Sequence, residues 1–399
     1  MLPSVADYRN AALRRLPRFA FDYLEGAAED GDALRRNLDS FHRVLLRPRV
    51  LRDLTQCSIE TTWFGEPSSA PMAVGPTGLN GLFWSKADEL LAAGAAAQGL
   101  PFILSTASTS LLEDVRAAAP KADLWLQLYV QKDRGIAEDI MRRASTAGYR
   151  CLVMTVDTPV HGKRDHDIRN GFKLPIRLTP RLIRDVLRHP AWGWQMLRHG
   201  SPQLLNIARS MGEAPDLSKH AAALSRAMDL NLQWNDISWL RRHWNGPVLI
   251  KGIQTVEDAR QAARSGADGI VLSNHGGRQL SGAPAPMDTL PAVRKAVGKQ
   301  IRIFVDGGVR RGADAIKAIA CGADGVLLGR APLYGLAASG KHGINEILTL
   351  LHEEAAICMR LLGCTAIDEL SPEHIQQLPL FPSYPPQPIA SYPSCEITA

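Results

Sequence analysis

Residues 302–330, RIFVDGGVRRGADAIKAIACGADGVLLGR, contain two short apolar runs separated by an alanine-rich segment with helical spacing. The first run leads into Gly307 and Gly308, and the second leads into Gly329 and Arg330. A strand, a glycine turn and a helix that leads to another strand form one unit of a parallel α/β sheet. This stretch therefore predicts an α/β fold.

The same alternation continues through the chain from residue 71 onward. Eight apolar or β-branched runs can be counted, and alanine-rich, charged stretches with helical spacing follow them. Eight parallel strands with intervening helices predict a closed (β/α)8 barrel, the TIM barrel, although a doubly wound open sheet has the same alternation. The runs are residues 71–78, 101–106, 123–130, 151–157, 247–253, 269–276, 302–308 and 325–330.

The length of 399 residues and the apolar content of 45% suit one large domain. We expect a single domain over residues 1–378, with the barrel at about 71–365 and a helical extension before it. A long insertion after the fourth strand is expected at about 166–235, and loops of this length are usually functional or disordered. Residues 379–399 are rich in proline and predict an irregular tail.

The six cysteines are scattered without CxxC spacing or neighbouring histidine clusters. This pattern argues against a metal site and against a dense disulfide framework, and it fits a reducing compartment. The N-terminus carries Asp7, Arg9, Arg14 and Arg15 in place of a long apolar run, so a signal peptide is not indicated. No stretch of 18 uncharged apolar residues occurs, and we expect no membrane-spanning helix.

The formal net charge of +6 fits several anionic partners, so the location of the basic residues matters more. Residues 177–209 hold six arginines against one acid, Asp185, interleaved with aliphatic residues, Trp192 and Trp194. A basic amphipathic stretch with tryptophans predicts contact with an anionic membrane surface. A surface excursion that packs on its own protein or on a sister subunit explains the pattern equally well. Nucleic acid is a poorer candidate, because no binding module accompanies the charge.

The strongest chemical signal is residues 273–278, SNHGGR, at the end of the sixth run. His275 is a natural proton acceptor near neutral pH, and Arg278 can clamp a carboxylate with two hydrogen bonds. A lone histidine at a strand end is more often structural, but its pairing with Arg278 favours catalysis. Asp157 ends another run and could stabilise a protonated His275, or else simply cap a turn before Pro159.

Residues 306–312, DGGVRRG, and 328–330, LGR, follow the last two runs. Glycines expose backbone N–H groups, a helix N-terminus follows each turn, and arginine adds charge, which is how barrels bind phosphate. The pattern predicts a phosphorylated ligand without identifying it. The residues concerned are Asp306, Gly307, Gly308, Arg310, Gly329 and Arg330.

Lys251 ends the fifth run and can be read in three ways. A fixed positive charge there could stabilise an anionic reduced flavin, a Schiff-base lysine would indicate an aldolase or isomerase, and a buried salt bridge would be structural. A membrane-associated scaffold without activity is a weaker reading, since it gives no reason for His275 and Asp157 to converge.

The motifs together resemble the family of FMN-dependent 2-hydroxy acid dehydrogenases and oxidases. The resemblance covers roughly residues 5–375. The segments that carry it are YLEGA at 23–27, GPTG at 75–78, QLY at 127–129, TVD at 155–157, SNHGGRQ at 273–279, DGGVR at 306–310 and GR at 329–330.

The resemblance implies flavin mononucleotide (FMN) as the cofactor. Residues implied at the ring and ribityl chain are Pro76, Thr77, Gly78, Ser105, Gln127, Thr155, Lys251 and Ser273. Residues implied at the ribityl chain and phosphate are Asp306, Gly307, Gly308, Arg310, Gly329 and Arg330. The residues implied at the substrate are Tyr23, Arg164 and Arg278 for its carboxylate, Tyr129 for its hydroxyl, His275 as the base and Asp157 as the partner of the base.

Within the family, the chain is most similar to the (S)-mandelate dehydrogenases, through GPTGLNG at 75–81 and STAS at 105–108. Gly78 replaces the alanine of the oxidases, and Ala107 replaces the tryptophan of glycolate oxidase, which leaves room for a phenyl ring. This resemblance implies aromatic acid catabolism, with lactate or glycolate oxidation as the alternative, the latter using oxygen. It further implies a homotetramer held peripherally on the cytoplasmic side of the inner membrane, where a quinone or another chain component accepts the electrons.

Overall fold

The computed structural model describes residues 1–169, 179–217, 219–220 and 228–378. The proline-rich stretch 379–399, expected to be an irregular tail, lies outside the described residues. So do residues 170–178, which include the start of the basic stretch.

Eight parallel strands close into a barrel in the order β10-β11-β4-β5-β6-β7-β8-β9. Each of the eight predicted runs contains one of them. The first and last barrel strands pair, with Val326 facing Met72 and Leu328 facing Val74, so the predicted (β/α)8 barrel is confirmed and the open sheet is excluded. The strands are β4 Met72–Val74, β5 Phe102–Ser105, β6 Leu124–Leu128, β7 Cys151–Thr155, β8 Val248–Ile253, β9 Gly269–Leu272, β10 Arg302–Asp306 and β11 Gly325–Leu328.

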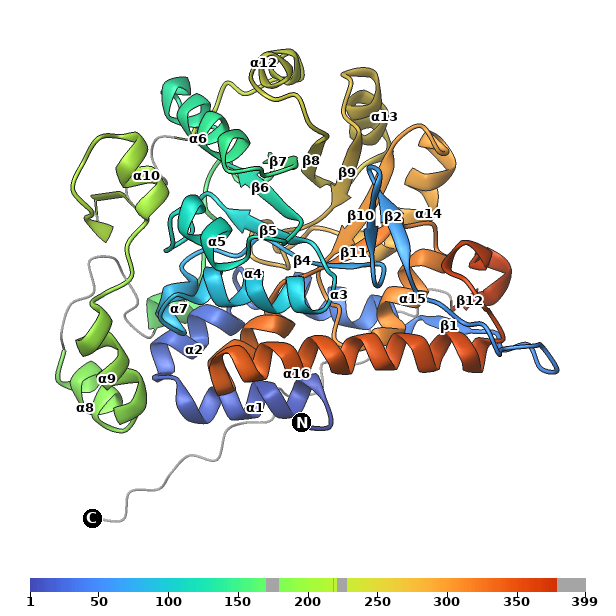
Figure 1. Cartoon of the computed structure of the whole chain (residues 1–399), viewed down its shortest axis with the longest axis horizontal. Helices are drawn as coiled ribbons and strands as arrows, with labels where there is room; N and C mark the ends of the chain where they lie inside the picture. The colour runs from blue at the N-terminus through green and yellow to red at the C-terminus, as the bar shows by residue number, and fades with distance from the viewer. Residues whose placement is uncertain (170–178, 218, 221–227, 379–399) are drawn as a thin grey trace.

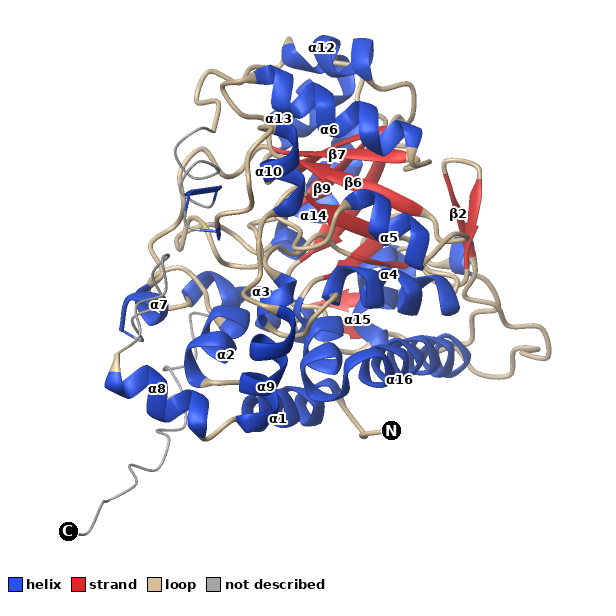
Figure 2. Cartoon of the chain, turned by 60° about the vertical axis from the view of Figure 1, so that its left-hand side comes forward, coloured by secondary structure: helices blue, strands red, loops and turns tan. Residues whose placement is uncertain are grey.

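Helices surround the strands on the outside of the barrel (Figures 1 and 2). The longest, α16, has non-helical backbone at Ser339 and Gly340, and it runs beside the N-terminal helix α1 (Figure 1). The outer helices are α4 Ala87–Ala97, α5 Leu112–Ala118, α6 Arg134–Thr146, α12 Asp236–His243, α13 Val256–Arg264, α14 Pro286–Val297, α15 Gly312–Ala320 and α16 Arg330–Leu362. Short 3-10 helices lie at Asn80–Leu82, Ile367–Glu369 and Pro372–His374.

A two-stranded hairpin, β2 Thr61–Trp63 and β3 Glu66–Ser68, closes the amino-terminal end of the barrel. Trp63 is buried and its indole N–H donates to the carbonyl of Asp324, just before β11. Its ring meets Phe304 edge-on, with 5.0 Å between ring centroids. Because the interior is filled with side chains from this end, a ligand must enter from the carboxyl ends of the strands.

The N-terminal helices α1 Val5–Arg15, α2 Arg18–Glu25 and α3 Asp32–His42 pack on the carboxyl-end loops. A Cβ atom on Gly277 would lie 2.6 Å from the backbone nitrogen of Leu34, and one on Gly308 would collide with the carbonyl of Asn37. Both glycines have positive φ, so glycine is required for conformation and for space. Strand β1 Val44–Leu46 pairs with β12 Ile375–Gln377 and ties this extension to the far end of the chain.

The insertion carries α7 Asp165–Arg169, α8 Pro180–Leu187, α9 Pro190–His199 and α10 Leu205–Ser210. Helices α8 and α9 form a hairpin beside α1 and α2 (Figures 1 and 2). The Asp185 carboxylate accepts from the backbone N–H of Arg18 at 2.7 Å, and the Trp192 indole donates to the carbonyl of Leu82 at 2.8 Å. The hairpin is therefore anchored to the body of the protein. None of the described helices is long and apolar enough to cross a membrane.

Candidate active site

The loop after β9 carries His275 in a left-handed backbone conformation, with φ of 59°. Its N–H donates to the Ser273 hydroxyl at 2.9 Å. The next residue back, Asn274, forms a reciprocal pair of amide hydrogen bonds with Asn37 of α3, each 2.7 Å long and fully buried. Gly276 and Gly277 then turn with positive φ. The glycines make the turn possible, and the amide pair fixes it against the N-terminal extension.

His275 lies between a carboxylate and a phenol. Its Nδ1 is 3.0 Å from Oδ1 of Asp157, and its Nε2 is 3.4 Å from the Tyr129 hydroxyl oxygen. Burial raises the pKa of Asp157, but the charges of His275 and Lys251 outweigh it and hold that pKa below its usual value. Asp157 is thus an ionised partner that fixes the imidazole with Nε2 toward the cavity. Gly252 makes room for it, since a Cβ there would lie 2.6 Å from the Cβ of Asp157.

Lys251 is 4% exposed and lies within β8, which continues to Ile253, so it does not end its strand as the sequence suggested. Its ammonium lies 3.0 Å from Oδ2 of Asp306 and 2.9 Å from the Ser273 hydroxyl. Burial lowers the pKa of Lys251, yet Asp306 and Asp157 raise it above the ordinary lysine value. The amine is therefore a fixed positive charge at neutral pH.

Two guanidinium groups flank the ring of Tyr23, with carbon-to-centroid distances of 5.7 Å for Arg164 and 5.0 Å for Arg278. The Nη1 of Arg278 donates to the carbonyls of Tyr23 and Gly26, each at 2.9 Å, which orients the group. Burial, together with the charge of Arg164, lowers the pKa of Arg278 to about 9. Among the described residues, none accepts a hydrogen bond from the buried Nε of Arg164. Arg164 also forms an ion pair with Asp167 at 3.8 Å, and the two guanidinium groups together can bind a carboxylate through several hydrogen bonds.

In another part of the cavity lining, β10 ends in Asp306 and is followed by the positive-φ residues Gly307 and Gly308. Helix α16 begins at Arg330, so the positive end of its dipole meets this turn. Asp306 has a buried Oδ1 to which no described residue donates. Arg330 is held in place by the carbonyls of Gly276, Leu24 and Gly26, at 3.0, 3.3 and 2.8 Å.

A cavity of about 620 Å³ joins these groups. One wall is apolar and includes Leu79, Phe83, Ala107 and Leu204. Gly78 belongs to the same wall, and a Cβ on it would lie 2.9 Å from the Cβ of Ala107. The loop after β4, which carries Gly78, and the loop after β5, which carries Ala107, are therefore in close contact. Small residues at both positions make this contact possible.

Asp88 holds these two loops together from below. It is fully buried and accepts from the side chains of Asn80 and Ser108 at 2.7 and 2.9 Å, and from the N–H and hydroxyl of Thr109 at 3.0 and 3.1 Å. Burial raises the pKa of Asp88, and these donors oppose the rise. One carboxylate thus spans the loop after β4 and the loop after β5, which carry Gly78 and Ala107.

A sequence profile of FMN-dependent dehydrogenases matches residues 12–377. The chain belongs to this family. The (S)-mandelate dehydrogenase of Pseudomonas putida is 43% identical over 373 residues, which cover 94% of this chain and 93% of that protein. The L-lactate dehydrogenase of Chromohalobacter salexigens is 42% identical over 376 residues, covering 94% and 95%. A crystal structure of (S)-mandelate dehydrogenase, described as a monotopic membrane protein, matches with a TM-score of 0.91 at 42% identity and covers 94% of this chain and all of that one.

FMN is the cofactor of this family, and the residues present fit it. The buried, undonated Oδ1 of Asp306 can accept from a ribityl hydroxyl, and the Gly307–Gly308 turn beside the α16 N-terminus suits a phosphate. Lys251 offers a fixed positive charge to a flavin ring. The cavity volume lies within the usual range for cofactor sites, about 300–1,000 Å³.

Most of the residues predicted from the sequence line this cavity. They are Tyr23, Pro76, Thr77, Gly78, Ser105, Tyr129, Arg164, Lys251, His275, Arg278, Asp306, Gly307, Gly308, Arg310, Gly329 and Arg330. Four others lie one layer behind it. Gln127 bonds to Ser105 and to Thr155, each at 3.0 Å, while Asp157 and Ser273 support His275 and Lys251.

Sequence reasoning missed several residues of the site. His161 and Asp167 flank Arg164 and line the cavity, and their closeness to that arginine was the available signal. Phe83 and Leu204 also line it, but they come from a loop and from the insertion, and nothing local marks them. Asn37 could not have been found, because its partner Asn274 is 237 residues away.

Proposed function

We propose that this enzyme oxidises an aromatic (S)-2-hydroxy acid, (S)-mandelate or a ring-substituted mandelate, to the 2-oxo acid. The observation that carries the proposal is the small Ala107 in an apolar wall of the cavity that also holds Arg164, Arg278 and His275. A carboxylate bound by the arginines leaves the α-substituent facing apolar surface, where a phenyl ring gains from burial. The similarity to (S)-mandelate dehydrogenase supports the same assignment.

Each polar residue of the cavity has a task in this reaction. Arg164 and Arg278 hold the substrate carboxylate, and the unpaired Nε of Arg164 gains its acceptor. Tyr129 contacts the hydroxyl, and the Nε2 of His275 takes the hydroxyl proton. Asp157 stabilises the protonated imidazole. FMN, when bound, accepts the two electrons that leave the α-carbon.

The residues that would hold FMN follow from the same cavity. The ring would lie against the loop at 76–78, with Ser105, Gln127, Thr155 and Ser273 around it and Lys251 near its anionic form. Asp306 to Arg310, Gly329 and Arg330 would hold the ribityl chain and the phosphate. The Schiff-base reading of Lys251 is disfavoured, because a protonated amine paired with Asp306 is a poor nucleophile.

L-lactate is the second candidate substrate. Relatives named L-lactate dehydrogenase reach 42–43% identity, nearly the same as the mandelate enzyme. Lactate uses the same carboxylate, hydroxyl and α-hydrogen contacts, and differs only in placing a methyl group against the apolar wall. Glycolate oxidation with oxygen as the acceptor is a further alternative within the family.

The proposal includes peripheral attachment to an anionic membrane surface and delivery of the electrons to a quinone or other membrane acceptor. On the α8–α9 hairpin, Leu187, Trp194 and Leu197 are 75%, 64% and 77% exposed. Arg184, Arg188 and Arg198 are exposed on the same two helices. Apolar side chains flanked by arginines suit the interface of an anionic bilayer. A homotetramer on the cytoplasmic side of the inner membrane completes the proposal, and analytical ultracentrifugation tests the assembly.

An anaerobic absorbance spectrum before and after (S)-mandelate tests the central proposal. We expect the flavin band of the purified protein to bleach with (S)-mandelate and to stay unchanged with the (R) enantiomer. Bleaching by L-lactate or glycolate alone would leave the family assignment intact and overturn the aromatic one. Comparison of kcat/KM for mandelate and lactate then ranks the two substrates.

A further inference from the structure

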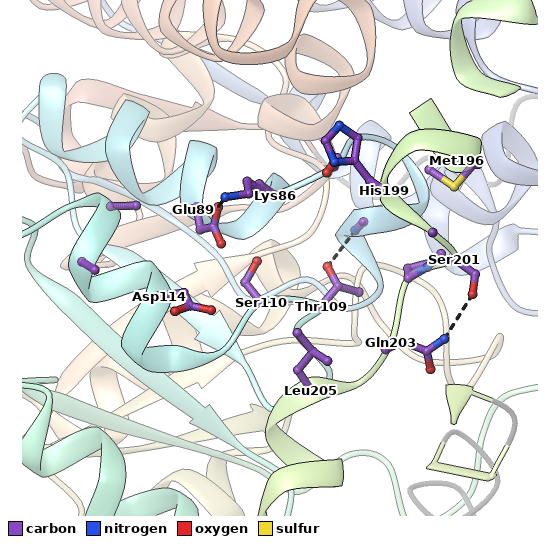
Figure 3. A pocket seen from close by; sticks show the side chains of 16 residues that line it. Lys86, Glu89, Thr109, Ser110, Asp114, Met196, His199, Ser201, Gln203 and Leu205 are labelled. Carbon is purple, nitrogen blue, oxygen red and sulfur yellow. Dashed lines mark hydrogen bonds and ion pairs between the residues drawn. The ribbon is translucent and has the colours of Figure 1, made fainter. Parts of the chain in front are cut away.

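A second cavity lies between the insertion and the outer face of the barrel. It has a volume of about 640 Å³ and is enclosed by the start of α4, by α5 and by the segment that joins α9 to α10 (Figure 3). Met196, His199, Gln203 and Leu205 line it from the insertion, and Ser110 and Ala118 line it from the barrel side. The reaction proposed above uses none of these residues.

The two cavities share a thin wall. Leu79 and Ala107 line the active-site cavity, while Gly81 and Thr109, two residues farther along the same loops, line the second one. Within the insertion, Leu204 faces the first cavity and Leu205 the second. The Gly81 N–H donates to the Thr109 hydroxyl at 2.9 Å, which closes the wall. A molecule in the second cavity is therefore one layer of residues away from the active-site cavity.

Across the second cavity from this wall lies α9, a helix of the α8–α9 hairpin that we propose contacts the membrane. Helix α9 turns Met196 and His199 toward the cavity, while Trp194 and Leu197 are exposed on its other face. In an α-helix, residues three and four apart share a face, so this division follows directly from the sequence spacing. A lipid-soluble ligand could thus reach the cavity at the edge of the proposed membrane contact.

The lining of the second cavity combines apolar side chains, hydrogen-bonding groups and charged groups. Met196, Leu205 and Ala118 offer apolar surface, and Ser110 and His199 offer hydrogen-bonding groups. Gln203 adds an amide to the lining, and its Nε2 donates to the Ser201 hydroxyl at 3.1 Å. Lys86 lies 3.9 Å from Glu89, so these two charges offset each other, and the exposed carboxylate of Asp114 also lines the cavity (Figure 3).

We infer that this second cavity binds the membrane quinone that accepts the electrons, an inference that rests on the proposed function. Oxidation of the 2-hydroxy acid to the 2-oxo acid releases two electrons and two protons. The quinone takes up both electrons and both protons and leaves as the quinol, whose hydroxyl groups can bond to Ser110 and His199. Substrate and acceptor then have separate sites, and neither must leave before the other binds.

The test blocks the second cavity and leaves the active site alone. Ala118→Trp places a large side chain in the cavity, and Ala97→Trp, at the far exposed end of α4, is the matched control. The probe is a ubiquinone analogue with a short alkyl tail. Its binding to the oxidised holoenzyme is measured by calorimetry, and its KM is compared with that of ferricyanide, a hydrophilic oxidant that needs no apolar site.

For Ala118→Trp we expect the Kd and KM for the quinone to rise by about tenfold or more, since overpacking excludes a ligand that fills the cavity. Ferricyanide turnover and anaerobic bleaching by the hydroxy acid should equal those of Ala97→Trp. A second variant, Gln203→Leu, should weaken quinone binding by a smaller factor with the same unchanged controls.

Equal quinone binding and KM in Ala118→Trp and Ala97→Trp would overturn the inference while the proposed function stands. A wild-type protein that is bleached by the hydroxy acid but neither binds nor reduces the quinone would overturn it too. Failure of every 2-hydroxy acid to bleach the flavin would instead defeat the proposed function itself, so the two failures are distinguishable.

Discussion

The charged end of the active-site cavity and its apolar wall are built in opposite ways. At the charged end, His275, Asp157 and Lys251 are fixed by contacts of about 3 Å to partners at neighbouring strand ends. The apolar wall is held through its backbone, since the Leu79 N–H donates to the Ala107 carbonyl at 2.9 Å and the Ala107 N–H donates to the Ser105 hydroxyl at 3.1 Å. The surface that it presents to the cavity is formed by apolar side chains, Leu79 and Phe83 from the loop after β4 and Leu204 from the insertion.

Because of this difference, we expect the charged end to determine the turnover rate and the apolar wall to determine the selectivity between substrates. Directional polar contacts set where a proton goes, so their loss lowers turnover of every substrate. A packed apolar wall sets only the volume available to the α-substituent of the substrate, so a change there alters the ratio of kcat/KM between two substrates. The variants below test whether the two regions can be changed independently.

The largest effect is expected from His275→Asn. Removal of the general base should lower kcat by about 10²–10⁴-fold for mandelate and lactate alike. The flavin spectrum and the thermal midpoint should stay close to wild type, because the Asn274 amide pair holds the loop. Steady-state kinetics check this, and turnover within threefold of wild type for any hydroxy acid would contradict the role of His275.

Asp157→Asn should lower kcat by about 10–100-fold, the usual cost of losing a carboxylate behind a working imidazole. The pKa of Asp157 is held below its usual value, so above about pH 4 the carboxylate is ionised and its pairing contributes to activity and stability; both contributions are lost as pH falls through that lowered pKa. In the variant, the loss of activity that comes from protonation of Asp157 at low pH should disappear, because an amide does not titrate. A pH profile of the same shape as that of the wild type would argue against this role.

Ala107→Trp tests the apolar wall. The indole should fill the space proposed for the phenyl ring and reduce the kcat/KM ratio of mandelate to lactate by about tenfold. The kcat for lactate should change little, since the charged end is untouched. Ala107→Ser, of nearly the same size, serves as the control. Equal losses for both substrates would show that the two regions are not independent.

Asp88→Asn tests the carboxylate beneath the wall. An amide nitrogen would face donors that now find an acceptor, so unfolding free energy should fall by about 1–3 kcal/mol. Substrate selectivity should also drift, because the loops carrying Gly78 and Ala107 lose their common anchor. Chemical denaturation checks the first expectation. A variant as stable as wild type would mean that the loops are held by packing alone.

The smallest effect on catalysis is expected from a substitution on the α8–α9 hairpin. Leu197→Glu should weaken binding to anionic liposomes by about tenfold, the loss expected for one buried leucine. Bleaching by substrate in solution should stay unchanged. Leu361→Glu, on an equally exposed leucine of α16, is the control and should bind as wild type does. Equal binding by both variants would place the membrane contact elsewhere.

The fold and the charged end of the site could be predicted from the sequence because their signals are local. Each barrel strand is a short apolar run, Asp157 and His275 come just after the end of one, and Lys251 lies near the end of another. The apolar wall was only partly predictable, since Phe83 and Leu204 reach it through loops whose path no motif records. Asn37 and Asp88 act through contacts far apart in sequence or hidden behind the cavity, and only coordinates show them.

The pairing of β1 with β12 has a consequence for the active site. The helices that supply Tyr23 and Asn37 are followed by β1, whose partner strand ends at Gln377 and is reinforced by a hydrogen bond from the Arg47 N–H to the His374 carbonyl. The two ends of the described chain therefore support each other, and the extension that supplies Tyr23 and Asn37 is secured in part by a strand more than three hundred residues later in the sequence. A deletion of β12 should thus loosen the active site from a distance, without removing any residue that lines the cavity.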